Sequence, residues 1–199
     1  PDERMTPYVD FPETRELTAR TLSLDSALFR YPYRVRVQDD KAVVLDLHGT
    51  EYFFHAFHYP GFHYLSSFGK RGDAPEEMLS AENLRWNGNF LWTLDSNKSE
   101  LTRLGFASSG DSLLRLEAVS LDEELLRALD FVQYDDSTFI IPDYSGDSRF
   151  CLVSRQGKLL HKIGTIPTTD EDALKNAHPA LAQAWRSFID YNPRNGVLA

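Results

Sequence analysis

The chain has 199 residues, enough for one domain with its own hydrophobic core. Its formal net charge of −9 makes a nucleic-acid backbone or an anionic lipid surface an unfavourable partner. Cys151 is the only cysteine, which excludes an internal disulfide and a cysteine-based zinc cluster, and no apolar run is long enough to span a membrane as a helix.

Three segments of the chain repeat one pattern, an apolar run that ends on an aspartate. The aspartates are Asp46, Asp95 and Asp143, and they are 49 and 48 residues apart. A pair of turn-forming residues precedes each run, and a glycine followed by another apolar run comes fourteen or fifteen residues after each aspartate. A period of this length indicates a repeat architecture.

Each repeat has the composition of four short strands. In the first repeat, residues 33–38 alternate between polar and apolar, and Asp39 and Asp40 form a tight-turn signal before the next apolar run. Four antiparallel strands in about 48 residues are typical of a β-propeller blade. The predicted blades span approximately residues 33–69, 82–119 and 130–164.

Two segments lie outside the blades. Residues 120–129 begin with a capping-box pattern, Ser120 with Glu123, which predicts a helical turn between blades. Residues 171–191 have apolar positions at helical spacing and predict a helical insertion, with Pro179 as an expected interruption.

The last residues, 192–199, predict a turn that enters a new strand. The sequence as a whole therefore predicts one all-β domain over residues 1–199. Its expected fold is a partial β-propeller, with about three four-stranded blades, the start of a fourth and a helical insertion near the C-terminus.

The link between the first two blades, "FGKRGDAPEEM" at residues 68–78, carries a further pattern. Together with the blades, it resembles the TolB-like six-bladed propeller family of Bacteroidota. The family's G-x-x-G-x-x-P-x-E turn is matched by Gly69, Gly72, Pro75 and Glu76 or Glu77. The resemblance extends from about residue 20 to the end and implies the N-terminal half of a six-bladed protein.

Members of that family are typically exported and often lipoproteins. The resemblance therefore implies the periplasm or the outer membrane as the location. The polar first residues show no export signal, so the cytoplasm remains an alternative. The family supplies no catalytic residues that could be carried over to this sequence.

The loops after the second strands share one propeller face with the links between blades. The candidate binding residues on that face are Asp46, Asp95, Asp143, Lys98 and Arg149, for a cation or a sugar hydroxyl. The alternative is that each aspartate accepts backbone N–H bonds in its own turn. The recurrence of the aspartate in every repeat favours this structural role.

Other motifs give weak signals. "DSNKSE" at residues 95–100 lacks the glycine and the glutamate of a calcium-binding loop. The "GDS" copies at residues 110–112 and 146–148 fall at predicted turns and lack the glycines of a serine-protease loop. On a strand, His55 and His58 point to opposite faces, so the histidine-rich first repeat does not predict a metal site. We expect no metal, no cofactor and no catalytic residue.

The sequence and the resemblance favour a non-enzymatic binding or scaffold module of the cell envelope, with an unknown protein or carbohydrate ligand. The alternative is a glycan-acting hydrolase or lyase with its site in the upper loops or in a missing half. Three blades cannot close a ring. We therefore expect the chain to self-associate or to pair with a missing C-terminal half.

Overall fold

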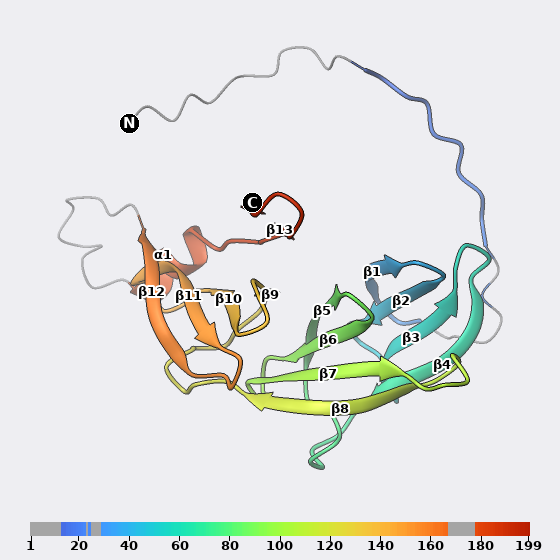
Figure 1. Cartoon of the computed structure of the whole chain (residues 1–199), viewed down its shortest axis with the longest axis horizontal. Helices are drawn as coiled ribbons and strands as arrows, with labels where there is room; N and C mark the ends of the chain where they lie inside the picture. The colour runs from blue at the N-terminus through green and yellow to red at the C-terminus, as the bar shows by residue number, and fades with distance from the viewer. Residues whose placement is uncertain (1–12, 23, 25–28, 167–177) are drawn as a thin grey trace.

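The computed structural model describes residues 13–22, 24, 29–166 and 178–199, and within them three four-stranded antiparallel sheets form an arc (Figure 1). The first sheet contains β1 (Pro32–Gln38), β2 (Lys41–Asp46), β3 (Tyr52–His58) and β4 (His63–Lys70). The second contains β5 (Ala81–Asn87), β6 (Phe90–Asp95), β7 (Glu100–Phe106) and β8 (Leu113–Ser120). The third contains β9 (Val132–Gln133), β10 (Thr138–Pro142), β11 (Ser148–Ser154) and β12 (Leu159–Thr165).

In each sheet the strands pair in chain order, as in a propeller blade. Figure 1 shows the first strand of each sheet, β1, β5 and β9, on the inner side of the arc, with β4, β8 and β12 on the outside. The predicted all-β fold class and partial propeller are confirmed. No helix in the described part of the chain is long and apolar enough to cross a membrane.

The hairpins between the first and second strands follow from their turn residues. Asp39 adopts a φ of 51° in the two-residue turn after β1, and Gly88 a φ of 56° in the turn after β5. The second turn consists of Gly88 and Asn89, because Asn87 still pairs with Phe90, so it lies one residue later than the Asn-Gly signal suggests.

Neighbouring sheets share hydrophobic cores. Between the first and second sheets, Phe54 and Phe68 stack with ring centroids 5.1 Å apart and pack near Leu84 and Leu91. Between the second and third sheets, the buried rings of Trp92 and Phe139 meet edge to face at 5.1 Å. Burying side chains of this size contributes roughly 1.5–3 kcal/mol each, so these cores hold the sheets together.

The two ends of the arc are partly covered. On the outer face of the first sheet, Phe57 packs with Phe29 and Leu24 from the N-terminal segment. On the outer face of the third sheet, Ile189 and Leu198 pack against Ile140. Leu198 belongs to a short hairpin of β13 (Tyr191–Asn192) and β14 (Val197–Leu198), which confirms the predicted entry into a new strand.

The helix near the C-terminus, α1 (His178–Ala184), is shorter than predicted at its C-terminal end. Pro179 lies in its first turn, where its missing N–H costs nothing. The chain leaves the helix because the backbone N–H of Ile189 donates to Asp130 and Tyr191 pairs in β13, so Phe188 is 62% exposed. Residues 171–177 of the predicted insertion lie outside the described residues.

The predicted capping box at Ser120 is wrong. Ser120 is the last residue of β8 and pairs with Glu100, so it does not begin a helix. The turn begins two residues later, where the Asp122 carboxylate accepts a hydrogen bond from the backbone N–H of Glu124 at 3.3 Å. Strand pairing therefore prevails over the local capping signal.

Candidate functional site

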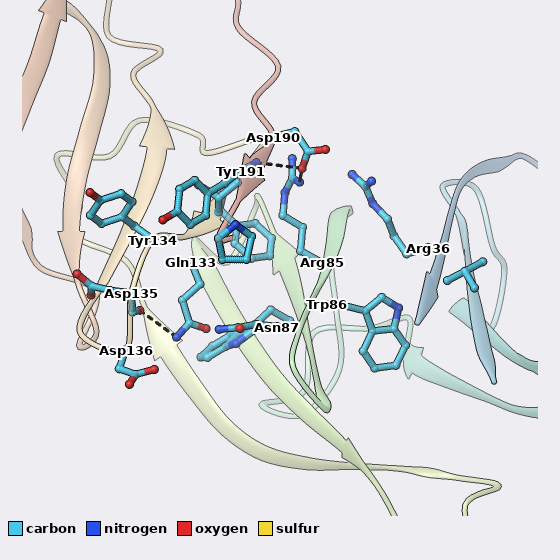
Figure 2. A pocket seen from close by; sticks show the side chains of 15 residues that line it. Arg36, Arg85, Trp86, Asn87, Gln133, Tyr134, Asp135, Asp136, Asp190 and Tyr191 are labelled. Atoms are coloured by element: carbon cyan, nitrogen blue, oxygen red, sulfur yellow. Dashed lines mark hydrogen bonds and ion pairs between the residues drawn. The ribbon is translucent and has the colours of Figure 1, made fainter. Parts of the chain in front are cut away.

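A cavity of about 370 Å³ lies where the innermost strands of the three sheets and the C-terminal hairpin converge (Figure 2). This volume falls within the usual range of small-molecule pockets, about 300–1,000 Å³. The residues that line it are Arg36 and Val37 of β1, Arg85, Trp86 and Asn87 of β5, Trp92 of β6, Phe131 to Asp136 around β9, and Asp190, Tyr191 and Pro193 around β13. We call it the channel cavity.

One wall of the channel cavity is fixed by Asp130. This buried carboxylate accepts hydrogen bonds from Arg85 Nη2 at 3.0 Å and from the backbone N–H of Ile189 at 3.1 Å, and from the side-chain amide of Asn83. Arg85 also forms an ion pair with Asp190 at 2.8 Å. Two carboxylates thus pair with Arg85 and join the second sheet to the segment that enters β13.

Arg36 differs from Arg85 because it has no direct partner among the described residues. Its buried Nε has no hydrogen-bond partner, and within the described residues no carboxylate forms an ion pair with its guanidinium. Burial lowers the pKa of Arg36, and the neighbouring charges of Arg85 and Arg34 lower it further, whereas the carboxylates of Asp190 and Asp130 partly oppose this. Figure 2 shows Arg36 extending from β1 toward Arg85 and Asp190. Arg36 therefore lacks a direct acceptor, although Asp130 and Asp190 lie close enough to act on its charge.

Trp86 supplies a second unpaired donor on the same side of the cavity. Its indole Nε1 is buried and has no hydrogen-bond partner in the described part of the chain. The ring itself is held in place by stacking on Phe106, with centroids 6.3 Å apart and planes 15° from parallel. Buried donors are nearly always satisfied in folded proteins, so two on one cavity wall require an explanation.

The opposite wall is the loop between β9 and β10. Tyr134 is 45% exposed, and its ring lies 5.3 Å from that of Tyr191. Asp135 accepts hydrogen bonds from Ser137 and from the hydroxyl of Thr138, which lower its pKa and keep it ionised. Asp136 is exposed and, among the described residues, its carboxylate has no partner. The cavity thus has a cationic side and an acidic side.

The three repeated aspartates lie elsewhere and are occupied by the backbone. Asp46 accepts hydrogen bonds from the N–H groups of Arg30 and Tyr31 at 2.8 and 2.7 Å. Asp143 accepts from Ser145 N at 2.9 Å and from the Ser148 hydroxyl at 2.7 Å.

Asp95 shows the same arrangement. Its two oxygens accept hydrogen bonds from Leu79 N at 2.7 Å and from Asn97 N and Lys98 N at 3.0 Å. All three aspartates are buried, as the structural interpretation expects. A role of these carboxylates in binding stays a prediction.

The two other candidates from the sequence also make internal contacts. Lys98 Nζ donates to the backbone carbonyls of Ala74 and Glu77 at 2.6 and 2.5 Å, which fixes the link between the first two sheets. The guanidinium of Arg149 lies 4.8 Å from the ring centre of Trp185, just after α1. None of the five candidates lines the channel cavity.

The residues that do line the cavity were missed because their signal lies in the repeat and not in a motif. Arg36, Arg85 and Gln133 each stand ten residues before one of the repeated aspartates. Val37, Trp86 and Tyr134 stand nine residues before the same aspartates. Projecting the repeat onto the innermost strands would have gathered these positions around one channel.

The histidines of the first sheet are separated. His55 is buried, with its Nδ1 2.8 Å from the Ser67 hydroxyl, whereas His58 is exposed and lies 3.4 Å from Asp40. Within the described residues, no group of three or more histidine, cysteine, aspartate or glutamate side chains is arranged to hold a metal ion.

Comparisons with known proteins show the fold. No curated protein matches the sequence. A protein of Bacteroides fragilis NCTC 9343 that is provisionally described as exported has 14% identity and a TM-score of 0.59, covering 75% of this chain and 42% of that one. A protein of unknown function from Desulfotomaculum acetoxidans DSM 771 has 15% identity and a TM-score of 0.47, with 66% and 41% covered. A Bacteroides fragilis NCTC 9343 protein provisionally described as a 6-phosphogluconolactonase has 11% identity and a TM-score of 0.49, with 67% and 40% covered.

The chain thus spans about two fifths of the length of these three structures. The family model described as TolB-like 6-blade propeller-like matches residues 10–199, which include every strand of the three sheets. The chain belongs to the TolB-like six-bladed propeller-like family.

Proposed function

We propose that this chain is a non-enzymatic binding module of the cell envelope and that its ligand occupies the channel cavity. The observation that supports this most directly is the pair of unsatisfied donors, Arg36 Nε and Trp86 Nε1, on one wall of the cavity. Leaving such a donor buried and unpaired costs roughly 1–3 kcal/mol. Both atoms have almost no accessible surface, so a ligand that shifts these side chains enough to supply acceptors would recover part of that cost.

The location in the envelope is supported by the family and by the structural likeness to the Bacteroides fragilis protein described as exported. Both similarities are to the fold, so the periplasm or the outer membrane is part of the proposal. Fractionation of cells that express the full-length gene would test it. Recovery of the protein in the cytosolic fraction alone would contradict this part of the proposal.

The side chains of the cavity favour binding over catalysis. Arg85 is held by two carboxylates and forms a fixed wall. A catalytic carboxylic acid needs a raised pKa, whereas hydrogen bonds lower the pKa of Asp135. These features suit a site that positions a ligand without transferring protons to it.

A matched pair of tryptophan substitutions tests the position of the site. Trp86→Phe keeps an aromatic ring but removes the Nε1–H in the cavity, and Trp185→Phe makes the same change outside it. Thermal midpoints would be measured with soluble envelope glycan fragments and short peptides as probes. We expect a probe that raises the midpoint of the wild-type chain to lose most of its effect with Trp86→Phe and to keep it with Trp185→Phe.

Three outcomes would contradict the proposal. In the first, no probe raises the midpoint of the wild-type chain. In the second, the two variants respond equally, which would place the site outside the channel cavity. In the third, chromatography of the incubated probe shows a cleaved product, which would make the protein an enzyme.

A further inference from the structure

The channel cavity contains two charged side chains of opposite sign that are not paired. On the β1 side stands Arg36, and on the loop between β9 and β10 stands Asp136, neither with a partner in the described residues. Figure 2 shows them on opposite sides of the group of lining residues. Arg85 is already paired with Asp130 and Asp190, so the charged groups of the cavity that lack a direct partner among the described residues are Arg36 and Asp136.

Between these charges lie aromatic rings and side-chain amides. Trp86, Tyr134 and Tyr191 offer flat apolar faces with polar edges. Asn87 and Gln133 carry amide groups that both donate and accept hydrogen bonds. Flat faces beside amides and carboxylates are suited to a ring that is apolar on its faces and carries hydroxyl groups on its rim.

We infer that the ligand is an acidic sugar, whose carboxylate pairs with Arg36 and whose hydroxyl groups contact Asp136 and the cavity amides. This inference rests on the proposed binding function and names its ligand class. The guanidinium of an arginine binds a carboxylate with two parallel N–H bonds, and the terminal nitrogens of Arg36 have no partner among the described residues.

Other ligand classes fit these side chains less well. A neutral sugar leaves Arg36 without a directly bonded counter-charge. An inorganic dianion carries a second negative charge, which Asp135 and Asp136 repel, and it makes no use of the rings. A small zwitterionic peptide such as dialanine can pair with both charges and with the side-chain amides but has no ring to lie on the aromatic faces, and it serves as a competing probe in the test.

The test uses matched probes and matched arginine variants of the whole chain. Calorimetric titrations would compare glucuronate with glucose and galacturonate with galactose, with acetate, inorganic phosphate and dialanine as further probes. Arg36→Gln removes the cavity charge, whereas Arg34→Gln removes the same charge two residues away on β1, outside the cavity. Circular dichroism and thermal midpoints would establish that both variants fold.

We expect each uronate to bind at least ten-fold more tightly than its neutral partner. Arg36→Gln should bring that ratio close to one, and Arg34→Gln should reduce it much less, because Arg34 acts on the cavity only as a neighbouring charge. Arg36→Lys should keep part of the preference, since it keeps the charge but not the two-pronged geometry. Asp136→Asn should weaken the acidic and the neutral sugar by similar factors.

Failure of this inference differs from failure of the proposed function. If neutral sugars bind as tightly as uronates, or if dialanine or acetate binds more tightly than either, the acidic-sugar assignment is overturned while a channel site sensitive to Trp86→Phe survives. If no probe in the titrations binds, the assignment is also overturned. The proposed function falls as well only when the thermal screen gives one of the three contradicting outcomes named for it.

Discussion

At the scale of single residues, the repeated aspartates show why one residue type recurs in each blade. Asp95 ends β6, and its carboxylate accepts N–H groups from both the following turn and the preceding link at Leu79. Asp46 does the same for Arg30 and Tyr31, which lie just before β1. In both blades one buried carboxylate therefore joins the end of the second strand to the chain that enters the first.

Replacing Asp95 by alanine should lower the free energy of unfolding by about 1–3 kcal/mol, because three backbone N–H groups lose their acceptor in a buried site. Urea denaturation would measure the change. Asp73→Ala removes an exposed carboxylate from the neighbouring link and serves as the control, with an expected change below about 0.5 kcal/mol. Equal effects of the two substitutions would show that Asp95 does not stabilise the turn.

His55 should make the fold sensitive to mildly acidic pH. Burial lowers its pKa below the ordinary value of 6.5, and the nearby charge of Asp46 only partly opposes this. The folded chain then binds a proton less readily than the unfolded chain. Stability is therefore fully present above about pH 6.5 and is lost as pH falls through that value toward the lower pKa of the folded state.

Urea denaturation at pH 7.5 and at pH 5.5 would test this. We expect the wild-type chain to be less stable at pH 5.5 and His55→Gln to lose less stability over the same interval. Carboxylates with lowered pKa values, such as Asp122 and Asp135, act only below about pH 4 and leave this window undisturbed. A wild-type chain that is equally stable at both pH values would refute the role assigned to His55. The substitution His58→Gln, at an exposed histidine of the same sheet, is the control and should lose as much stability as the wild-type chain.

At the scale of elements, Gly157, the glycine that follows the repeated aspartate of the third sheet, has a specific packing role. Gly157 adopts a φ of +86°, and a Cβ added there would lie 2.0 Å from the carbonyl oxygen of Ser120. The carbonyl of Gly157 also accepts a hydrogen bond from Asp122 N at 2.8 Å. The turn between β11 and β12 thus rests directly on the chain that leaves β8.

Gly157→Ala should therefore destabilise the chain more than Gly88→Ala does. Gly88 has a similar left-handed φ of +56°, but nothing lies within 4 Å of its added Cβ, so it reports the backbone strain alone, about 1–3 kcal/mol. The additional loss for Gly157→Ala measures the close approach to Ser120. Equal denaturation midpoints for the two variants would show that the close approach of Gly157 to Ser120 adds nothing to the loss of stability.

The strands could be predicted because their signals are local. The cavity could not be predicted, because its contacts join residues that are far apart in the sequence. Alternating residues and turn signals lie within a few positions of each other, as in β1 and its Asp39–Asp40 turn. The helix prediction beyond Ala184 failed because Ile189 is bound by Asp130, 59 residues away. Arg85 finds its partners 45 and 105 residues away, so no window of sequence shows that Arg85 has direct partners while Arg36 has none in the described residues.

At the scale of the whole molecule, the arc has two ends that differ in cover. The third sheet is partly covered by Ile189 and the β13–β14 hairpin. On the first sheet, Val35 and Val37 pair with Val44 and Ala42 on the outer face and remain 49% and 44% exposed, and Val37 also borders the channel cavity. In a closed propeller each blade face packs on a neighbour, so this face is an apolar surface that a further blade would bury.

We therefore expect the chain to associate through the outer face of the first sheet, with a second copy or with a polypeptide that supplies the remaining blades. Sedimentation velocity over micromolar concentrations should show an average mass that rises with concentration. Introducing Val35→Lys together with Val37→Lys should suppress the rise, since burying two ammonium groups in an apolar contact is costly. Leu114→Lys with Leu116→Lys makes the same change on β8 of the middle sheet, where the side chains are 53% and 48% exposed, and should leave the rise intact. A wild-type chain that sediments as one monomeric species and unfolds cooperatively would instead show that Leu24, Phe29 and the C-terminal hairpin cover the ends of the arc sufficiently.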